Sequence, residues 1–519
     1  MEQKQESKIR YNILIATVYI IGIILLLQLF NLQIINGKSY REQSNTRLTR
    51  ESTIKAARGN ILDSSGEKLV STKLVYNVEI YKTKVDNKTL NEALLLLANT
   101  LEGNGDKYKD NFPITVNPYA FKNEENGETF KKQNNIDLSY NAEQCFNHFK
   151  EKYKVETDNI EDARKIITLR YAISVDGYSN TKSVKLASNI SNKSLAKLNE
   201  MSASFPGIST TSEPTVSYPY GEMASHILGY VGPINGDELK AMGSEYNQND
   251  IIGKTGIEYV FEKYLRGKDG IKQIDMSVDG IVTDEYVTKE AVAGKDIMLT
   301  VDAELQKITE NALANNIKIM QEGYFGKPID AKEGAAVVLN VKSGEVLAMA
   351  SYPNYDPSLF TDGISTENWN KYRDAEDHPL MNKAIGTVSA PGSIYKMVTA
   401  IAVLESGAID TTTKINDTGR YTYYSDYQPT CWNKAGHGWL NVTAAIEKSC
   451  NYFFYETGRR TGIERIDQVA SAFGLGQKTG IELAGEVSGT LASEKTMGSW
   501  SGGYTVQAAI GQLNNAFTP

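Results

Sequence analysis

Cysteine is scarce in this chain of 519 residues, and an excess of positive charge is lacking. The three cysteines are too few for a disulfide framework, so a fold that depends on several disulfide bonds is excluded. Acidic residues outnumber basic ones by 63 to 55, and the net charge of -8 argues against a nucleic-acid binder with a basic surface. Wholesale disorder is also excluded, because 41% of the residues are hydrophobic and 23% are charged. At roughly 150 residues per domain, the length allows about three to four domains.

Long hydrophobic runs are lacking too, with one exception near the amino terminus. No charged residue occurs from Tyr11 to Gly37, and about 20 apolar residues are enough to span a bilayer. We predict a transmembrane helix near Ile13–Leu32. The run is longer than the roughly 7–15 residues of a signal peptide, and polar side chains follow it instead of a cleavage site, so we expect an uncleaved anchor. Basic residues flank both ends, so charge does not fix the orientation.

The remaining residues change in pattern near residue 291. Before it, the sequence mixes short elements, with alternation that predicts a strand at Leu69–Tyr81 and spacing that predicts a helix at Leu90–Leu101. A solvated insertion is expected at 103–160. It contains Cys145 and His148, for which packing or surface placement is favoured over metal binding because no second such pair is nearby.

After residue 291 the pattern predicts an α+β domain. Asp296–Val301 is predicted to form a strand, and Asp302 can cap a helix over Ala303–Ala314. Gly334–Leu339 and Glu345–Ser351 then read as a hairpin. Helices are expected to follow near Lys396–Leu404 and Ala444–Gly458, and a helix before an antiparallel hairpin is typical of the α+β class.

A serine and a lysine at helical spacing are the first candidates for catalysis. Pro391-Gly392 is a turn that places Ser393 at the start of a helix, with Lys396 one turn further on the same face. A serine hydroxyl needs a base beside it, and a buried lysine can act as one when burial leaves its amine neutral. The helix start also offers N–H groups to an oxyanion. A helix cap followed by a solvated lysine would give the same pattern.

A second motif, Ser449-Cys450-Asn451, lies downstream between helical segments. A serine and an asparagine can relay a proton to a leaving group and hydrogen-bond a substrate amide. The order Ser-x-x-Lys followed by Ser-x-Asn is the one used by penicillin-recognising serine enzymes.

With these motifs in place, the chain resembles a class B penicillin-binding protein of the elongation type, a membrane-anchored peptidoglycan transpeptidase. The match covers nearly the whole chain in family order. It comprises Arg58–Gly66, Tyr218–Gly221, His226–Gly232, Gly253–Glu258, Thr300–Asp302 with Gln306, Gly344–Met349, Ser351–Pro357, Cys431-Trp432, Gly436–Gly438 and Ser449–Asn451.

The resemblance implies three regions and a reaction. Residues 1–37 would be a cytoplasmic tail and anchor, 38–290 an elongated mixed α/β pedestal, and 291–519 a transpeptidase domain with an antiparallel sheet and flanking helices. The bulk would be extracytoplasmic. Its implied partners are the membrane, peptidoglycan stem peptides, beta-lactams and a polytopic glycan polymerase, and no nucleic acid is expected.

The resemblance also assigns roles to four residues. Ser393 would attack the carbonyl of the penultimate D-alanine of a stem peptide, and Lys396 would take its proton. Ser449, positioned by Asn451, would pass a proton to the departing D-alanine. The alternatives are a noncatalytic scaffold of the same fold and a beta-lactam sensor or resistance protein.

The family's third motif, Lys-Thr/Ser-Gly on a strand of the active site, has no match at the expected place. Lys254-Thr255-Gly256 and Lys478-Thr479-Gly480 are interpreted as unrelated, because the first lies in the pedestal region and the second follows a glycine-rich loop. The third motif would come after Pro519, so we expect a catalytic domain cut short and a chain that is catalytically incomplete.

A metal site is a further expectation around the second motif. Cys431, His437 and Cys450, with Asp426 as the weakest member, could form a tetrahedral zinc shell of structural type. Asp426 competes for this place with Asp417 and with its neighbours in a tyrosine-rich loop. His437 lies between two of the three cysteines in a chain with four histidines, which favours a metal. A Cys431–Cys450 disulfide and two unpaired thiols stay open as alternatives.

Overall fold

The computed structural model describes residues 2–38, 49–82, 84–122, 125–178, 183–276, 282–324 and 326–519. The chain divides into two compact units. The first takes in residues 1–57, 73–215 and 267–293, and the second takes in 58–72, 216–266 and 294–519. The single boundary that the sequence predicts at residue 291 therefore differs from the division in the structure. Two segments before that boundary, 58–72 and 216–266, belong to the unit that holds the catalytic motifs.

The first unit begins with a long apolar helix at the predicted place. Helix α1 spans Glu2–Phe30 and continues into the π-helical turn η1, Asn31–Ile35. Within the described residues, Ile15–Ile35 is the one helical stretch long and apolar enough to cross a membrane, with a mean hydropathy of 2.3. Its described side chains are almost all exposed, so no protein core accounts for their apolar character.

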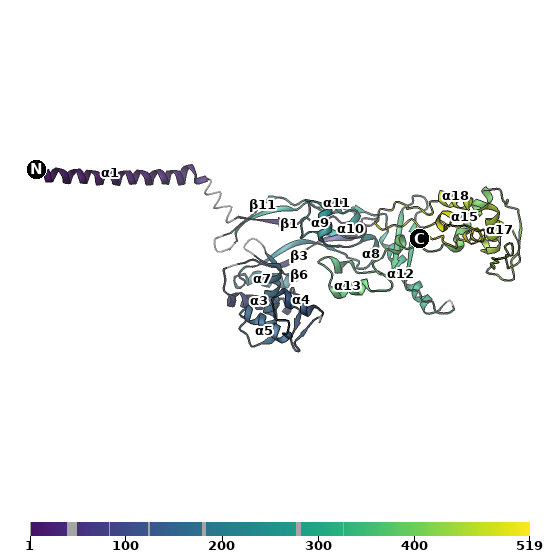
Figure 1. The fold of residues 1–519 in the computed structure, drawn as a ribbon, viewed down its shortest axis with the longest axis horizontal. Helices are drawn as coiled ribbons and strands as arrows, with labels where there is room; N and C mark the ends of the chain where they lie inside the picture. Colours follow the sequence, from purple (N-terminus) through teal and green to yellow (C-terminus); the bar gives the residue numbers. More distant parts are fainter. Residues whose placement is uncertain are drawn as a thin grey trace. The chain divides into compact units, whose positions relative to one another are not determined.

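The remainder of the first unit combines strands of two sheets with helices. The strand expected at Leu69–Tyr81 is confirmed as β3, and the helix expected at Leu90–Leu101 is confirmed within α3. Figure 1 shows α3, α4, α5 and α7 grouped beside β3 and β6. One sheet pairs β1 (Thr49–Ile54), β10 (Gly270–Met276) and β11 (Val282–Lys289). The other is five-stranded: β3 (Lys68–Ile80) pairs with β6 (Val184–Ile190) through its latter part, which lies in the first unit, and with β2 (Ile61–Leu62) through its first residues, which lie in the second unit. Strand β7 (Ile208–Ser217) also pairs with β3, and the helices of this unit are α3 (Asn87–Gly103), α6 (Ile160–Asp176) and α7 (Asn192–Glu200).

The predicted insertion folds as a small aromatic subdomain. Phe112 and Phe149 meet edge to face at the centre of a buried cluster, with ring centroids 5.4 Å apart. Cys145 is fully buried in the same cluster, which confirms packing as its environment. The subdomain consists of β4 (Ile114–Thr115), β5 (Ala120–Phe121), α4 (Glu125–Gln133) and α5 (Ala142–Lys152).

The second unit is built on the predicted helix and hairpin. Asp302 caps α12 (Ala303–Gln321) by accepting a hydrogen bond from Leu305, as expected. The hairpin is confirmed as β13 (Gly334–Leu339) and β14 (Val346–Tyr352). Gln306 of α12 is buried and exchanges two 2.8 Å hydrogen bonds with the backbone of Met349 on β14. The strand expected at 296–301 is shorter, with β12 covering only Ile297–Met298 beside β2, Ile61–Leu62.

Two of the motifs that carry the family resemblance meet in a buried ion cluster within this unit. The Arg58 guanidinium lies 2.6 Å from Glu258 Oε2 and 2.7 Å from Glu262 Oε2, and Glu258 is fully buried. The segment from residue 216 to 266 contains α8 (Ser225–Leu228), β8 (Val231–Pro233), α9 (Gly236–Met242), β9 (Ile251–Gly253), α10 (Gly256–Val260) and α11 (Glu262–Leu265).

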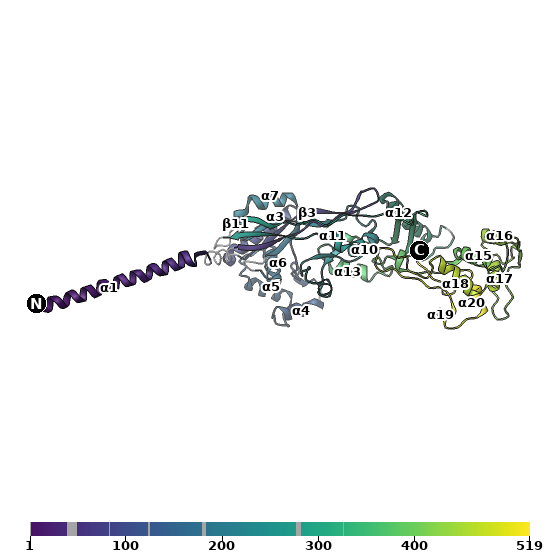
Figure 2. The same cartoon turned by 90° about the horizontal axis from the view of Figure 1, so that it is seen from above.

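A helical cluster completes the second unit and holds the two catalytic motifs. Figure 2 shows α15, α17, α18 and α20 gathered together. Buried apolar clusters join α15 to α17 around Phe453 and Phe454, and α15 to α18 around Ile466. Two shorter helices, α13 (Thr366–Arg373) and α14 (Lys383–Gly386), come before this cluster in the chain, and α14 packs against the β13–β14 hairpin. The cluster comprises the 3₁₀ turn η4 (Gly392–Tyr395), α15 (Lys396–Glu405), β15 (Ile415–Asp417), β16 (Gly438–Leu440), α16 (Val442–Glu447), α17 (Asn451–Thr461), α18 (Ile463–Ala472), α19 (Glu494–Met497) and α20 (Gly502–Ala508).

Candidate active site

Ser393 lies at a sharp turn at the start of a helix, where the sequence predicts it. Gly392 has a φ of +58°, which favours glycine, and the chain then enters η4 and α15. The Gly392 N–H donates to the carbonyl of Gly511 at 3.0 Å, so a second segment fixes the turn from behind. Ser393 itself is exposed, as a nucleophile that meets a large substrate must be.

The structure brings the Lys396 amine against all three other catalytic candidates. Lys396 is 2% exposed, and its Nζ lies 3.2 Å from Ser393 Oγ, 3.1 Å from Ser449 Oγ, 2.9 Å from the Ser449 carbonyl and 2.6 Å from Asn451 Oδ1. Two of these oxygens, the carbonyl and the amide oxygen, can only accept hydrogen bonds, whereas the two hydroxyls can also donate. A neutral amine therefore satisfies both acceptors with its two N–H groups and keeps its lone pair for a serine hydroxyl.

The protonation of Lys396 suits a general base. Burial lowers the pKa of Lys396 to about 8, although Cys450 and Cys431 act in the opposite direction. With that pKa, about a tenth of the amine is neutral at pH 7, compared with less than about a thousandth for an ordinary lysine. The Phe454 ring, 5.9 Å from Nζ, forms part of the apolar surroundings that disfavour the charge.

Ser449 lies at a break between two helices, and this break places both of its oxygen atoms near Lys396. Its φ of +47° is in the left-handed region, which is uncommon for a residue other than glycine. The conformation ends α16 and turns the carbonyl of Ser449 out of the helical ladder toward Lys396. The Cys450 side chain then caps α17 by accepting from the Phe453 N–H at 3.4 Å, so Asn451 begins the new helix beside Lys396.

A buried cluster of metal-ligand types lies directly behind this break. Ligand atoms of Asp417, Cys431, His437 and Cys450 all lie within 4.8 Å of one another. Asp417 Oδ2 is 2.7 Å from His437 Nδ1 and 3.2 Å from Cys450 Sγ, and His437 Nδ1 is 3.6 Å from Cys431 Sγ. Both cysteines are free, so they do not form the disulfide that the sequence left open.

The prediction of Asp426 as the carboxylate of this cluster is wrong, because the structure places Asp417 there. Strand β15 pairs with β16 so that Asp417 lies opposite Gly438, next to His437. Asp426 is exposed in the tyrosine-rich loop that follows. Sequence distance from Cys431 favoured the nearer acidic residue, whereas strand pairing brings the more distant one into place.

The charges around Asp417 fit a cation. Burial alone would raise its pKa, but the Gly419 N–H, His437 and both thiols donate to it and hold the pKa of Asp417 below its ordinary value. Burial also raises the pKa of the Cys450 thiol well above its usual range. A divalent ion would replace the protons shared between these groups and offset the burial of the carboxylate. The set of two sulfurs, one imidazole nitrogen and one carboxylate suits tetrahedral zinc.

Known protein families match both parts of the chain. The model of the penicillin-binding protein dimerisation domain matches residues 53–299, and that of the penicillin binding protein transpeptidase domain matches residues 334–519. The chain belongs to the class B penicillin-binding proteins of the elongation type.

Relatives of this penicillin-binding protein carry an enzymatic name. This chain is 32% identical over 345 residues to the peptidoglycan D,D-transpeptidase MrdA of Acinetobacter baumannii. That alignment takes in 65% of this chain and 49% of the relative, so it spans about half the relative's length.

Two solved structures resemble the penicillin-binding protein over most of its length. One is the complex between PBP2 and MreC from Helicobacter pylori, with a TM-score of 0.65, 25% identity, and 91% of this chain and 74% of that chain covered. The other concerns the structural coordination of polymerization and crosslinking by a peptidoglycan synthase complex. It has a TM-score of 0.64 and 25% identity, and the match covers 98% of this chain and 75% of that one.

Both Lys-Thr-Gly tripeptides of the penicillin-binding protein contact carboxylates and not the catalytic residues. The amine of Lys254 lies 2.5 Å from Glu238 Oε2 on α9. Thr479 donates twice to Glu486, through its N–H and its hydroxyl, both at 2.6 Å, and Gly480 donates to the same carboxylate. Both tripeptides are thus held by local carboxylates, in line with the interpretation that neither is the third motif.

The carboxyl-terminal segment is a support of the site that sequence reasoning missed. Phe517 exchanges two 3.0 Å backbone hydrogen bonds with Ser389, just before the nucleophile turn, and its ring stacks on Tyr395. Gly511 lies directly under Gly392. Gly511 was the available signal in the sequence, but its contact with Gly392 joins segments that lie far apart along the chain, so no local pattern indicates it.

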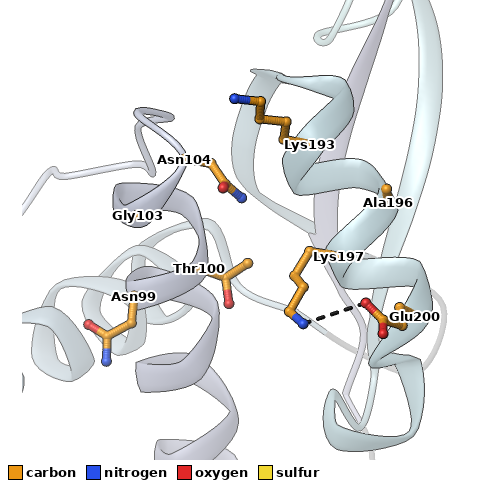
Figure 3. A pocket seen from close by; sticks show the side chains of 8 residues that line it. All are labelled: Asn99, Thr100, Gly103, Asn104, Lys193, Ala196, Lys197 and Glu200. Atoms are coloured by element: carbon orange, nitrogen blue, oxygen red, sulfur yellow. Dashed lines mark hydrogen bonds and ion pairs between the residues drawn. The ribbon is translucent and has the colours of Figure 1, made fainter.

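A polar hollow in the first unit contains none of these groups. It lies between α3 and α7, where Lys197 extends toward Glu200 along its own helix (Figure 3). Its walls are formed by Asn99, Thr100, Gly103, Asn104, Lys193, Ala196, Lys197 and Glu200.

Proposed function

We propose that this chain is a peptidoglycan D,D-transpeptidase that cross-links stem peptides through an acyl-enzyme on Ser393. The observation that carries the proposal is the buried Lys396 amine in contact with Ser393, Ser449 and Asn451 at once. A serine joined to a base, which is itself oriented by further groups, is the general arrangement of an activated nucleophile. The names of the relatives support the same activity.

The acylation step follows from the hydrogen bonds of Lys396. The neutral amine accepts the Ser393 proton as Oγ attacks the carbonyl of the penultimate D-alanine. When the tetrahedral intermediate collapses, the peptide bond to the terminal D-alanine breaks. Ser449, whose Oγ is 3.1 Å from Lys396 Nζ, passes a proton to the departing amine and is resupplied by the lysine. In this proposal the carbonyl of Ser449 and Asn451 Oδ1 hold the lysine in place throughout.

The second step reverses these roles. An amine from another stem peptide attacks the acyl-enzyme, and its proton returns through Ser449 and Lys396 to Ser393 Oγ as the ester bond breaks. Beta-lactams would acylate Ser393 in the same way, because their strained amide occupies the place of the D-alanyl bond.

We place the enzyme at the cell membrane, with α1 as a single-pass anchor and the bulk outside the cytoplasm. The apolar stretch Ile15–Ile35 supports this location. The similar structures include a complex with MreC and a peptidoglycan synthase complex that couples polymerization to crosslinking. Comparable partners, including a polytopic glycan polymerase, are therefore proposed for this chain.

The Ser393→Ala variant tests the proposed activity in the complete protein. A fluorescent penicillin is expected to label the wild-type protein covalently and to leave Ser393→Ala unlabelled, because the substitution removes the hydroxyl that forms the acyl ester, and the second hydroxyl at Lys396, that of Ser449, serves as the proton relay. Release of D-alanine from a lipid-linked substrate in the wild type would separate transpeptidation from mere binding of the antibiotic. Equal labelling of the wild type and Ser393→Ala would contradict the assignment of Ser393 as the nucleophile.

We also propose that Asp417, Cys431, His437 and Cys450 bind one structural zinc ion. Four protein ligands leave no open position, so the ion would supply rigidity and not a reactive water. Through Cys450, it would hold the helix break that presents Ser449 and so support the site without entering the reaction.

Asp417→Asn and Asp426→Asn form a matched pair for this zinc proposal. The first replaces a buried ligand and the second replaces an exposed residue of the same type. Elemental analysis should find about one zinc per chain in the wild type and in Asp426→Asn. Loss of the ligand is expected to lower metal affinity at least about tenfold, so Asp417→Asn should lose its zinc on dialysis against a weak chelator.

A thermal melt provides the second readout of the same experiment. Chelation should lower the Tm of the wild type and of Asp426→Asn to that of Asp417→Asn, since a structural zinc contributes folding energy. Zinc-free wild-type protein, or equal zinc retention by the two variants, contradicts the proposal.

A further inference from the structure

One exposed tryptophan connects the buried cluster to the catalytic helix break. Trp432 directly follows Cys431, and its indole N–H donates to the carbonyl of Lys448 at 3.0 Å. Lys448 directly precedes Ser449. The indole therefore joins two segments that are separated along the chain, one from the cluster behind the site and one from the site itself.

The acceptor of this bond is well placed to control Ser449. The carbonyl of Lys448 and the N–H of Ser449 belong to one rigid peptide plane, so a rotation of that plane changes the φ of Ser449 directly. That φ is +47°, a conformation that costs free energy and persists only when its surroundings hold it. The N–H side of the plane donates to Ile446 at 3.0 Å, and the carbonyl side accepts from Trp432.

The exposure of Trp432 separates this bond from core packing. The residue is 65% exposed, and its ring contacts His437 at a centroid distance of 5.1 Å. Most of its large apolar surface therefore contributes nothing to a buried core. Trp439, which is 68% exposed on the neighbouring strand β16, offers a control with nearly the same exposure.

We propose that Trp432 is a positioning residue for the reaction: its indole N–H holds the Lys448–Ser449 peptide plane so that both Ser449 oxygens face Lys396. The inference deepens the proposed function and rests on it for its catalytic consequence. The hydrogen bond from Trp432 should matter most in the acylation step, where the hydroxyl of Ser449 must lie in line with the lysine and the leaving amine. Noncovalent capture of a beta-lactam should depend on it much less.

Trp432→Phe removes the N–H and keeps an aromatic ring, and Trp439→Phe is the matched control. In the complete protein, stopped-flow acylation by a fluorescent penicillin should show a first-order acylation constant about tenfold lower for Trp432→Phe, with the noncovalent dissociation constant within twofold of wild type. Trp439→Phe should stay within twofold in both constants. Zinc content should be the same in all three proteins.

Amide hydrogen exchange of the segment 446–452 gives a readout that does not depend on catalysis. Exchange there should be at least about tenfold faster in Trp432→Phe than in the wild type, because the φ of Ser449 is held on one side only. Trp439→Phe should match the wild type. If the wild type failed to acylate, the proposed function would fall, and the exchange comparison would still decide whether Trp432 holds the peptide plane.

Three outcomes overturn the inference. The first is unchanged exchange over 446–452 in Trp432→Phe. The second is faster exchange with an acylation constant equal to that of the wild type, since the hydrogen bond from Trp432 would then have no catalytic role. The third is a loss of zinc from Trp432→Phe that matches its loss of acylation, which would assign the effect to the metal cluster.

Discussion

The Lys396→Met variant is expected to lose acylation by about three orders of magnitude while remaining folded, because removal of a general base of this kind costs roughly 10²–10⁴-fold. Methionine keeps the unbranched shape of the buried stem and removes only the amine. The amine is what joins Ser393 to Ser449 and Asn451, so its loss leaves the nucleophile without a proton acceptor. The measurement is the second-order rate constant for labelling by a fluorescent penicillin.

The pH profile of the wild type is the companion measurement for Lys396. Its pKa is lowered to about 8, and the base is the neutral form, so acylation should rise with pH up to about 8 and level off above it. The residual reaction of Lys396→Met should lack that rise. Thermal melting provides the folding control, since removing a buried, partly charged amine is not expected to lower the Tm sharply. A profile that is flat between pH 6 and 9 in the wild type would show that another group is the base.

Ser393 and Lys396 could be predicted as a pair because their spacing is local. Ser393 and Lys396 lie one helical turn apart, so one α-helix places them together whatever surrounds it. The break at Ser449-Cys450 was harder to foresee. The sequence predicted a helix near this motif, and the structure divides it into α16 and α17 at the left-handed Ser449. Periodicity describes helices well but does not register a single strained residue between them.

The parts that sequence reasoning missed or ranked wrongly all depend on pairing between distant segments. Asp417 enters the metal-ligand cluster through the register of β15 against β16, which no local pattern specifies. The two-unit division has the same origin, because residues 58–72 and 216–266 join the second unit through tertiary packing. A linear reading places boundaries where composition changes, whereas the fold places them where side chains pack.

Gly511→Ala is expected to damage both the stability of the fold and the position of the nucleophile. Gly511 has a φ of +70°, and a Cβ there would overlap the carbonyl oxygen of Gly392 and come within 2.7 Å of the Tyr395 Cβ. Neither neighbour can swing aside, because one is backbone and the other lies at the root of a buried side chain. Left-handed strain and overpacking together should lower the free energy of unfolding by about 3 kcal/mol.

The same methyl group should also displace the nucleophile. Gly392 directly precedes Ser393, so a shift that relieves the overlap moves the attacking oxygen relative to Lys396. A misplacement of about 1 Å can cost about 10²-fold in rate, and the acylation constant of Gly511→Ala is expected to fall by that order in the fraction that remains folded.

Gly474→Ala separates strain from overlap in this prediction. Gly474 has a φ of +83°, yet a Cβ there would meet no atom within 4 Å. The control therefore carries the left-handed cost alone, about 1 kcal/mol, and should acylate like the wild type. Tm and acylation rate measured on both variants decide the matter. If Gly511→Ala acylates as fast as Gly474→Ala, the segment beneath Gly392 does not position Ser393, and the support assigned to it is wrong.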